Sequence, residues 1–412
     1  MWQDSGQRET IERFLASSAR PVFIEPGEDP YPLQPERFAI EWQGQHLVFQ
    51  VWDERRNLAR RVIGIEEEKP GRLTLTVEKF ARRTGMVQLV DTARPAAQAV
   101  TRRSARQSFR EEFRRYLRRQ FPGWRIGEVT TEADLEHSLS PAYSRAFLKQ
   151  GGVGWAAIGA PPDGAPPNGA MSFGLIWADY LRRRERRVTV EGLALFLPAG
   201  RHRTAALRLP WLNPRALKTA LFLYSADAQE ALLDPCDYGN LETRLDAPRA
   251  QTVADAGKPE QILEARVRAD LESIDATLLP RPVYGQAPTF AAGERDVIDL
   301  LAADRYGRLA VVELKASQDL HLPLQALDYW MRVRWHSERG EFGSRGYFPG
   351  VPLSREPPRL LLVAPAFEFH PTTETILRFL SPEIEVERIG LAVEWNQRVR
   401  VVLRARGAER PA

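Results

Sequence analysis

The sequence predicts an α/β chain of the multidomain α+β class, on three observations. Its 412 residues leave room for two or three domains, and a hydrophobic content of 43% is enough to build their cores. The first hundred residues read mainly as strands, whereas the remainder alternates short apolar runs with segments of helical periodicity. We expect a β-rich domain at 1–100, an α/β middle domain at 101–245, a linker at 246–258 and a second α/β domain at 259–412.

The composition narrows the functional classes. With 58 Lys and Arg against 54 Asp and Glu, the net charge of +4 permits a nucleic-acid partner without demanding one. The single cysteine, Cys236, excludes a disulfide framework and a cysteine-rich zinc site, as in proteins of a reducing cytosol. No run of eighteen apolar residues exists, and the N-terminus lacks the regions of a signal peptide. We expect a soluble, cytoplasmic protein with no membrane partner, and a homodimer stays open.

The N-terminal region reads as a small barrel or sandwich. Strand patterns run over 38–53 and 60–80, with Gly44, Pro70 and Gly71 as turn markers. Such a module binds nucleic acid in some proteins and forms dimers in others. No ordered aromatic and basic pattern selects either role, so structural packing is the default interpretation.

The run from Thr101 to Phe121 predicts an amphipathic helix with arginines over most of its surface. Its apolar face consists of Phe109, Phe113, Tyr116 and Leu117. The basic face suits a phosphate backbone, where each neutralised phosphate releases counterions. We prefer an ordinary helix whose Arg and Glu side chains face water, because Glu111 and Glu112 interrupt the basic face.

A second helix is expected around Met171 to Leu181, after a flexible loop at Gly159–Ala170 and before a strand around Val188 to Leu197. The string FGLIWADYLRR in this region is similar to LQALDYWMR further along, and both precede an apolar strand. The middle domain is therefore a candidate degenerate copy of the C-terminal one, although periodicity this weak also arises by chance. Its strand GWAAIGA carries no Glu-x-Lys, so the copy lacks the charged residues considered next.

The most informative segment runs from Asp296 to Arg332. Two β-branched apolar runs flank Asp304-Arg305-Tyr306-Gly307, whose residue types favour a turn, so a β-hairpin is predicted. If the turn centres on Tyr306, residues whose numbers sum to 612 face each other, and Asp299 lies opposite Glu313 with Cβ atoms roughly 5 Å apart. Lys315 lies on the same face as Glu313, because side chains alternate along a strand.

Two carboxylates held this close repel each other and are costly to desolvate. A hard divalent cation with oxygen ligands, Mg²⁺ or Mn²⁺, would relieve that repulsion between Asp299 and Glu313, and the ammonium of Lys315 would complete the charge balance beside a nucleophilic water. The chemistry indicated is phosphodiester hydrolysis. The alternative is an exposed two-sided hairpin with surface charges, but apolar residues on both sides of each charge favour a buried strand.

An aspartate, thirteen residues and then Glu-Leu-Lys resembles the PD-(D/E)XK nuclease superfamily, and IDLLAADRYGRLAVVELK resembles its NucS-type endonuclease branch most. The resemblance covers roughly Pro259 to His336 and implies a restriction-endonuclease-like αβββαβ core with a mixed sheet. It implies that Asp299 and Glu313 bind the metal and that Lys315 is catalytic. Ile298 precedes the aspartate, so the proline that names the superfamily is absent, a departure common among its members.

The resemblance also implies two helical residues of the site. Gln325 matches the glutamine of the helix after the strands. The glutamate of the helix before them is assigned to Glu264, within a helix expected over Pro259 to Asp275. Glu260 lies one turn earlier on the same face and Glu272 two turns later, so these two stay open as alternatives.

The helix that contains Gln325 carries further candidates. Helical spacing places Gln325, Tyr329 and Arg332 on one face, where Tyr329 and Arg332 are candidates for binding substrate and the latter for a phosphate contact. A solvated helix face is the alternative. Asp319 and His321, just before this helix, are expected to cap it or to belong to the loop.

Two further residues have simple interpretations. Asp304 is expected to form the turn, and His370 to be a loop or capping residue before a helix near Thr372. The strand Arg359–Phe367 completes the order helix, three strands, helix, strand.

The sequence thus predicts a metal-dependent endodeoxyribonuclease that leaves 5′ phosphates, as the resemblance implies. It leaves open whether the DNA is single-stranded, branched or mismatched, and whether the role is repair or defence as a restriction subunit. The alternative of another class is a non-catalytic DNA-binding or assembly protein that retains the fold. The closely packed charges argue against that alternative, because an idle fold has no reason to keep them.

Overall fold

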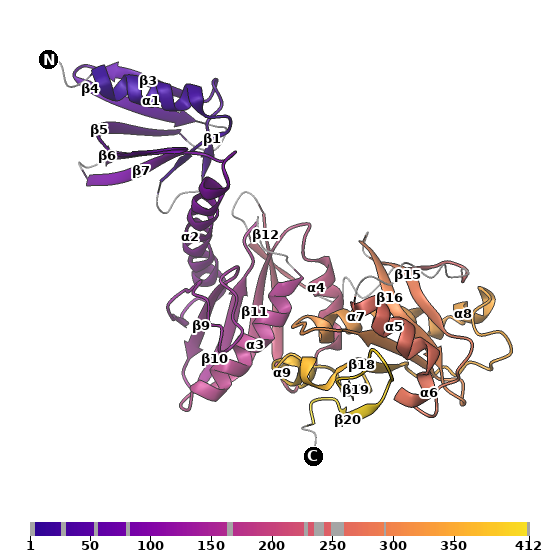
Figure 1. The fold of residues 1–412 in the computed structure, drawn as a ribbon. Helices are drawn as coiled ribbons and strands as arrows, with labels where there is room; N and C mark the ends of the chain where they lie inside the picture. The colour runs from indigo at the N-terminus through magenta and orange to yellow at the C-terminus, as the bar shows by residue number, and fades with distance from the viewer. Residues whose placement is uncertain are drawn as a thin grey trace. The chain divides into compact units, whose positions relative to one another are not determined.

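A computed structural model describes residues 5–25, 30–52, 57–79, 83–162, 168–225, 230–234, 243–248, 259–291 and 294–409. Contacts divide the chain into unit 1, Met1–Pro122 with Val129–Thr131, and unit 2, Gly123–Glu128 with Glu132–Ala412. Helices and several sheets are mixed along the chain, as expected for an α+β multidomain protein (Figure 1). None of the helices in the described ranges combines the length and apolar character that crossing a membrane requires.

Unit 1 is built on one antiparallel sheet with the strand order β2-β1-β7-β6-β5-β4-β3. Its strands are β1 (Pro21–Ile24), β2 (Tyr31–Pro32), β3 (Phe38–Gln43), β4 (His46–Trp52), β5 (Asn57–Lys69), β6 (Arg72–Lys79) and β7 (Arg83–Asp91). The hairpins predicted at Gly44 and Gly71 are confirmed, and both glycines have the positive φ angles that such turns need. Helix α1 (Ser5–Ser17), which the sequence pattern did not reveal, packs Ile11 and Phe14 against this sheet.

Helix α2 (Pro95–Gln120) belongs to unit 1, so the unit extends beyond residue 100. The apolar face predicted for this helix is confirmed, because Phe109, Phe113, Tyr116 and Leu117 are all buried. Glu111 and Glu112 pair with arginines of the same helix at 3.4 and 3.8 Å. These pairs are those of the ordinary amphipathic helix that we preferred.

The first part of unit 2 carries a six-stranded sheet in the order β13-β12-β11-β10-β9-β8. Its strands are β8 (Arg125–Ile126), β9 (Ser144–Gln150), β10 (Val153–Gly159), β11 (Thr189–Pro198), β12 (Lys218–Tyr224) and β13 (Glu230–Leu233). Helix α3 (Gly169–Arg184) packs on β10 and β11, whereas α4 (Arg203–Arg208) and a 3-10 turn (Leu209–Trp211) follow β11. The predicted helix near Met171 and the strand near Val188 are therefore α3 and β11.

The second part of unit 2 carries a seven-stranded sheet in the order β14-β15-β16-β17-β18-β19-β20. Its strands are β14 (Thr243–Leu245), β15 (Tyr284–Ala291), β16 (Glu294–Ala303), β17 (Leu309–Leu314), β18 (Arg359–Pro365), β19 (Val386–Leu391) and β20 (Val401–Arg406). Its helices are α5 (Pro259–Ala269), α6 (Leu271–Ile274), α7 (Leu322–Glu338), α8 (Glu341–Ser344) and α9 (Thr373–Leu377), with a 3-10 turn at Ala366–Glu368. The predicted order of helix, three strands, helix and strand is confirmed.

One detail of this order differs from the prediction. The helix expected over Pro259–Asp275 divides into α5 and α6 at Asp270, whose backbone is not helical. The Asp270 carboxylate accepts a hydrogen bond from Ser273 Oγ at 2.5 Å, the kind of local contact by which aspartate favours a helix start over a helix interior. Both short helices still cover the same face of the sheet through Leu263, Val267 and Leu271.

The two sheets of unit 2 repeat one arrangement. In each, three sequential antiparallel strands are followed by two parallel pairings and a final antiparallel one, from β8 to β13 and again from β15 to β20. In each, a long helix lies between the third strand and the fourth (α3, or α7 followed by the short α8), and a shorter one (α4 or α9) lies between the fourth and the fifth. The strand order and direction therefore match the duplication that the sequence suggested as one alternative.

A single apolar core joins the two parts of unit 2. It contains residues of α3 and of α7 together with both sheets, and α3 packs on α9 as α4 packs on α7. The middle and C-terminal parts, expected as separate domains, therefore form one compact unit. Most of the expected linker, residues 249–258, lies outside the described residues.

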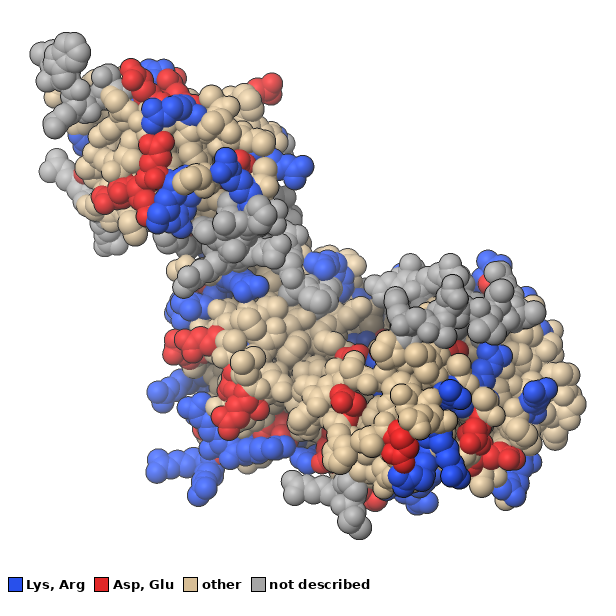
Figure 2. Space-filling view, in the orientation of Figure 1, with Lys and Arg blue, Asp and Glu red and all other residues tan. Residues whose placement is uncertain are grey.

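The surface of unit 2 mixes both signs of charge but is locally basic. Figure 2 shows blue side chains gathering around the end of α3, and the exposed arginines there are Arg183, Arg184, Arg186 and Arg187. The small net charge of the chain is thus unevenly distributed, which leaves a local basic patch.

Candidate active site

The predicted hairpin is present as β16 and β17. Leu300 pairs with Val312, and the next three pairs also have numbers that sum to 612, so the register predicted from a turn centred on Tyr306 is confirmed. Asp304 forms the turn as expected, because its Oδ1 accepts the backbone N–H groups of Tyr306 and Arg308 at 2.9 Å. Gly307 has a φ of +79°, a conformation that glycine adopts at little cost.

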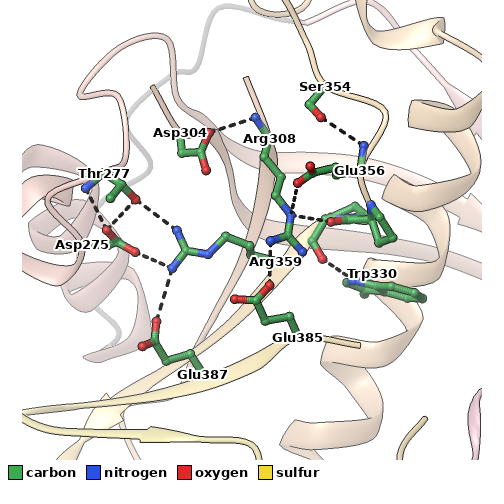
Figure 3. Close-up of polar contacts among 12 residues, drawn as sticks. Asp275, Thr277, Asp304, Arg308, Trp330, Ser354, Glu356, Arg359, Glu385 and Glu387 are labelled. Carbon is green, nitrogen blue, oxygen red and sulfur yellow. Dashed lines mark hydrogen bonds and ion pairs between the residues drawn. The ribbon is translucent and has the colours of Figure 1, made fainter. Parts of the chain in front are cut away.

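The turn end of the hairpin is held by two half-buried arginines (Figure 3). Arg308 donates to the carbonyl oxygen of Pro357 at 2.8 Å and pairs with Glu385 at 2.6 Å. Arg359, the first residue of β18, pairs with Asp275 at 2.5 Å and with Glu387 at 3.4 Å. These contacts fix the strands at one end and leave the other end of β16 and β17 free to separate.

At that other end the two strands part, and side chains replace the backbone pairing. After the Leu300–Val312 pair, β17 continues beside β18 with Glu313 and Leu314. The Leu314 N–H donates to Oδ2 of Asp299 at 2.9 Å. The carboxylate of Asp299 thus occupies the position that a strand carbonyl would otherwise take, which fixes its orientation toward β17.

The two acidic side chains meet where β16 and β17 separate, a position that we call the fork. A hydrogen bond joins the carboxyl groups of Asp299 and Glu313, and the side chain of Glu313 is only 1% exposed. Burial raises the pKa of Asp299 from an ordinary 3.8 to about 6, although the Leu314 N–H and Lys315 oppose the rise. Below about pH 6 the two carboxyls are therefore expected to share a proton when no cation separates them, and above it both are charged.

Lys315 supplies the positive charge beside them. Its Nζ lies 3.7 Å from Oε1 of Glu313 and 3.8 Å from Oδ2 of Asp319. Although burial alone would lower it, four surrounding carboxylates hold the pKa of Lys315 above its ordinary value; in order of effect these are Glu313, Glu260, Asp319 and Asp299. The prediction that Lys315 shares the face of Glu313 is confirmed, and the ammonium stays charged at neutral pH.

Of the three helical glutamates considered, Glu260 is the one whose charge is seen to act on Asp299 and Lys315. The negative charge of Glu260, in the first turn of α5, raises the pKa of both Asp299 and Lys315. Glu264, our first assignment, lies half-buried one turn further along α5, and Glu272 is exposed on α6. The observed charge effect favours Glu260, the alternative one turn earlier, and the assignment of Glu264 stays a prediction.

The residues predicted on α7 contact one another in sequence along the helix. Gln325 is half-buried and donates from Nε2 to the hydroxyl of Tyr329 at 3.0 Å, and the Arg332 guanidinium lies 5.8 Å from the centre of the Tyr329 ring. Tyr329 and Arg332 are 1% and 6% exposed. So little accessible surface favours packing for these two over the substrate contact that we had considered, and the solvated face is not observed either.

The segment before α7 links the site to the first part of unit 2. Asp319 accepts the N–H of His321 at 2.8 Å, and His321 immediately precedes α7 without a side-chain hydrogen bond that caps it, so of the two predicted roles the loop role is the one observed. Its Nδ1 lies 3.0 Å from Oγ of Ser172 in the first turn of α3, and burial lowers its pKa. His370 accepts the N–H of Thr372 before α9, as predicted. The sequence had not suggested the contact of Asp319 with Lys315.

The donor atoms at the fork suit a hard cation with few protein ligands. Within the described parts of the chain, no group of three or more His, Cys, Asp or Glu side chains is arranged to hold a metal ion. Two carboxylates are nevertheless what Mg²⁺ commonly takes from a protein, since it keeps several waters and substrate phosphate oxygens as its other ligands. Asp299 and Glu313 therefore fit such an ion, and the repulsion between them would fall when it binds.

A comparison of the chain with models of known protein families finds no match, and a search among curated proteins finds none either. The resemblance to PD-(D/E)XK nucleases therefore depends on the residues of the fork and on the order of the elements around it.

Proposed function

We propose that the chain is a divalent-metal-dependent endonuclease that hydrolyses phosphodiester bonds of DNA at the fork of β16 and β17. The observation that carries the proposal is the buried contact between the carboxyls of Asp299 and Glu313, with the charged Lys315 beside them. This arrangement is costly for folding and suited to holding a cation and an anionic substrate. The restriction-endonuclease-like core belongs to the same proposal and is supported by the element order from α5 to β18.

In this proposal Asp299 and Glu313 hold Mg²⁺ or Mn²⁺ through their carboxylate oxygens. When bound, the ion supplies Lewis-acid activation of the scissile phosphate and of the attacking water. The N–H of Leu314 keeps the Asp299 carboxylate in place, which reduces the reorganisation needed when the ion binds. Glu260 of α5 and Gln325 of α7 would surround the metal ligands without binding the ion themselves. Glu260 acts through its charge, and Gln325 lies in the first turn of α7.

Lys315 has an electrostatic role in this proposal. Its raised pKa keeps the ammonium protonated at neutral pH, so it is better suited to orient the water and neutralise the charge growing on the phosphate than to accept a proton. Asp319 and Glu313 hold its Nζ from two sides. The exposed arginines at the end of α3 provide a surface in the same unit for the phosphate backbone (Figure 2).

The direct test is cleavage by the full chain. Supercoiled plasmid, single-stranded DNA and mismatched duplex are incubated with Mn²⁺ or Mg²⁺, and with EDTA as control. We expect metal-dependent cleavage that falls by about 100-fold or more in Asp299→Asn, Glu313→Gln and Lys315→Met, since each removes a group that acts on the reacting phosphate. Glu356→Gln, which removes an exposed carboxylate of the loop before β18, is the matched control and should cleave at the wild-type rate.

A second readout separates an inactive fold from a wrong substrate. Mn²⁺ binding, followed by electron paramagnetic resonance, should be lost in Asp299→Asn and Glu313→Gln and kept in Glu356→Gln. Cleavage that persists in the Asp299 and Lys315 variants would refute the assignment of the site. DNA binding without metal binding or cleavage would instead support the non-catalytic alternative.

A further inference from the structure

The strand register identifies which residues of the six-stranded sheet of unit 2 (β8 to β13) correspond to the candidate active site of its seven-stranded sheet. Lys315 lies just beyond β17, and its N–H donates to the carbonyl oxygen of Val363 in β18 at 3.0 Å. The same bond occurs in the first sheet, where the N–H of Ala160, just beyond β10, donates to the carbonyl oxygen of Phe196 in β11 at 3.0 Å. Ala160 is therefore the counterpart of Lys315.

The two acidic positions follow from the same register. Glu313 pairs with the β18 leucine three residues before the Pro-Ala at the strand end, and Ile158 pairs with the β11 leucine three residues before the Pro-Ala there. Ile158 in turn faces Arg145 across β9, as Glu313 lies across the fork from Asp299. Arg145 and Ile158 are thus the counterparts of Asp299 and Glu313.

These counterparts have none of the chemistry proposed for the fork. Ile158 is fully buried in the apolar core of unit 2. Arg145 is 2% exposed and donates to backbone carbonyl oxygens of Ser140, at 2.5 Å, and of Glu132. A buried guanidinium repels a divalent cation, and neither the isoleucine nor Ala160 offers a ligand or a proton-transfer group.

Reciprocal contacts relate the two halves of unit 2 by an approximate two-fold axis. The N–H of Asn213, after α4, donates to the carbonyl oxygen of Phe379 at 2.8 Å, and the N–H of Ser381, after α9, donates to the carbonyl oxygen of Trp211 at 2.7 Å. Each bond is the counterpart of the other once α4 is matched with α9. Such exchange of equivalent contacts is the property of an isologous, two-fold interface.

Charged pairs across the same interface also join corresponding elements of the two halves. Arg208, at the end of α4, binds Asp328 of α7 with two hydrogen bonds of 2.8 and 2.7 Å. Arg378, just after α9, pairs with Asp179 of α3 at 3.6 Å. Helix α3 is the counterpart of α7, so the two pairs join corresponding elements, although the register that matches Trp211 with Phe379 places Ile376 and not Arg378 opposite Arg208. The Asp-Tyr similarity of the two helices thus has a structural meaning.

From this we infer that unit 2 is a fused pair of two nuclease-like halves with one competent site, so that each binding event on duplex DNA breaks a single strand. The inference rests on the proposed function. A two-fold protein presents equivalent positions to the two antiparallel strands of a duplex, which has matching local symmetry. Here one position carries Asp299, Glu313 and Lys315, whereas the other carries Arg145 and Ile158 with no counterpart of the lysine charge.

The test follows supercoiled plasmid over time with Mn²⁺ and limiting amounts of the full chain. We expect open-circular DNA to accumulate as the first product, with linear DNA appearing only after many nicks have built up on each molecule. Glu313→Gln should lower the nicking rate by about 100-fold or more, and the counterpart change Ile158→Val should leave it unchanged within about twofold.

The outcomes separate this inference from the proposed function. Absence of cleavage, or cleavage that survives Glu313→Gln, overturns the nuclease proposal and the inference with it. Linear DNA formed as the first product, at a fraction that dilution of the protein does not change, overturns the inference alone. Linear DNA that disappears on dilution supports it, because two chains with one site each would then supply the two cuts.

Discussion

The change Asp299→Asn tests whether the fork holds a charge that folding disfavours. Asparagine has the same shape and still accepts the N–H of Leu314, but it carries no charge beside Glu313. An ordinary mutation of a buried, hydrogen-bonded residue destabilises a protein. We expect the opposite here, and we expect the effect to depend on pH.

The magnitude follows from the pKa of Asp299. A folded-state pKa of about 6 against an ordinary 3.8 corresponds to a cost of at most about 3 kcal/mol for ionising the group in the folded protein. Because the folded-state pKa of Asp299 is the higher of the two, this group does not destabilise wild type below pH 3.8. The destabilisation grows as the pH rises from 3.8 and is complete above about pH 6. The asparagine variant should therefore match wild type near pH 4 and be about 1–3 kcal/mol more stable at neutral pH.

The assay is urea unfolding of the metal-free full chain, followed by tryptophan fluorescence and circular dichroism at both pH values. Glu356→Gln is the control, since an exposed carboxylate should change the free energy of unfolding by less than about 0.5 kcal/mol at either pH. Saturating Mn²⁺ should then raise the stability of wild type by about 3 kcal/mol at one hundred times its dissociation constant and leave the asparagine variant unchanged.

Two results would refute this reasoning. If Asp299→Asn is less stable than wild type at neutral pH, the carboxylate contributes to folding and the charge at the fork needs no cation. If Mn²⁺ stabilises both proteins equally, the ion binds elsewhere, and the metal assignment fails even though the stability argument holds.

Three further predictions concern the framework around the site. Gly307→Ala should cost about 3 kcal/mol in urea unfolding, because its Cβ would meet a backbone carbonyl oxygen at 1.9 Å, whereas Gly350→Ala, also at positive φ but in open space, should cost only about 1 kcal/mol. Arg208→Leu should cost about 3–5 kcal/mol by leaving a buried carboxylate unpaired, and Arg378→Leu, at a half-exposed ion pair across the same interface, less than about 1 kcal/mol; equal losses would contradict the difference in burial. Asp275→Asn should cost about 2 kcal/mol at neutral pH. Hydrogen bonds and a neighbouring guanidinium outweigh burial and lower this aspartate's folded pKa, so its contribution is present above pH 3.8 and lost below it, and a gap from wild type that persisted there on acid titration would be inconsistent.

The parts of the site that the sequence predicted depend on local geometry. A turn of suitable residues fixes the register of a hairpin, and a register of two short strands fixes which side chains face each other. The proximity of Asp299, Glu313 and Lys315 could therefore be predicted from the sequence alone. The order of helices and strands was equally accessible, because it depends on periodicity within each segment.

The parts that it missed depend on how distant segments dock. Helical spacing places Glu260 and Glu264 on one face, but only the position of α5 on the sheet decides whose charge reaches the fork. Tyr329 and Arg332 share a face with Gln325, yet their burial depends on the packing of unit 2 around α7. The duplication left little sequence similarity, because it consists of a shared strand order and hydrogen-bond register. Different side chains can maintain both equally well.

The two halves of unit 2 form an internal comparison. The first half completes the same strand arrangement with Ile158 in its core and with Arg145 satisfied by backbone carbonyl oxygens, so the fold itself does not require acids at these positions. The second half places Asp299 and Glu313 there, at a free-energy cost that the raised pKa of Asp299 indicates. A costly pair of charges that its own fold can do without, next to a lysine held by carboxylates, is best explained by binding and chemistry. The explanation stands or falls with the cation, because only a positive charge between the two carboxylates turns their repulsion into affinity.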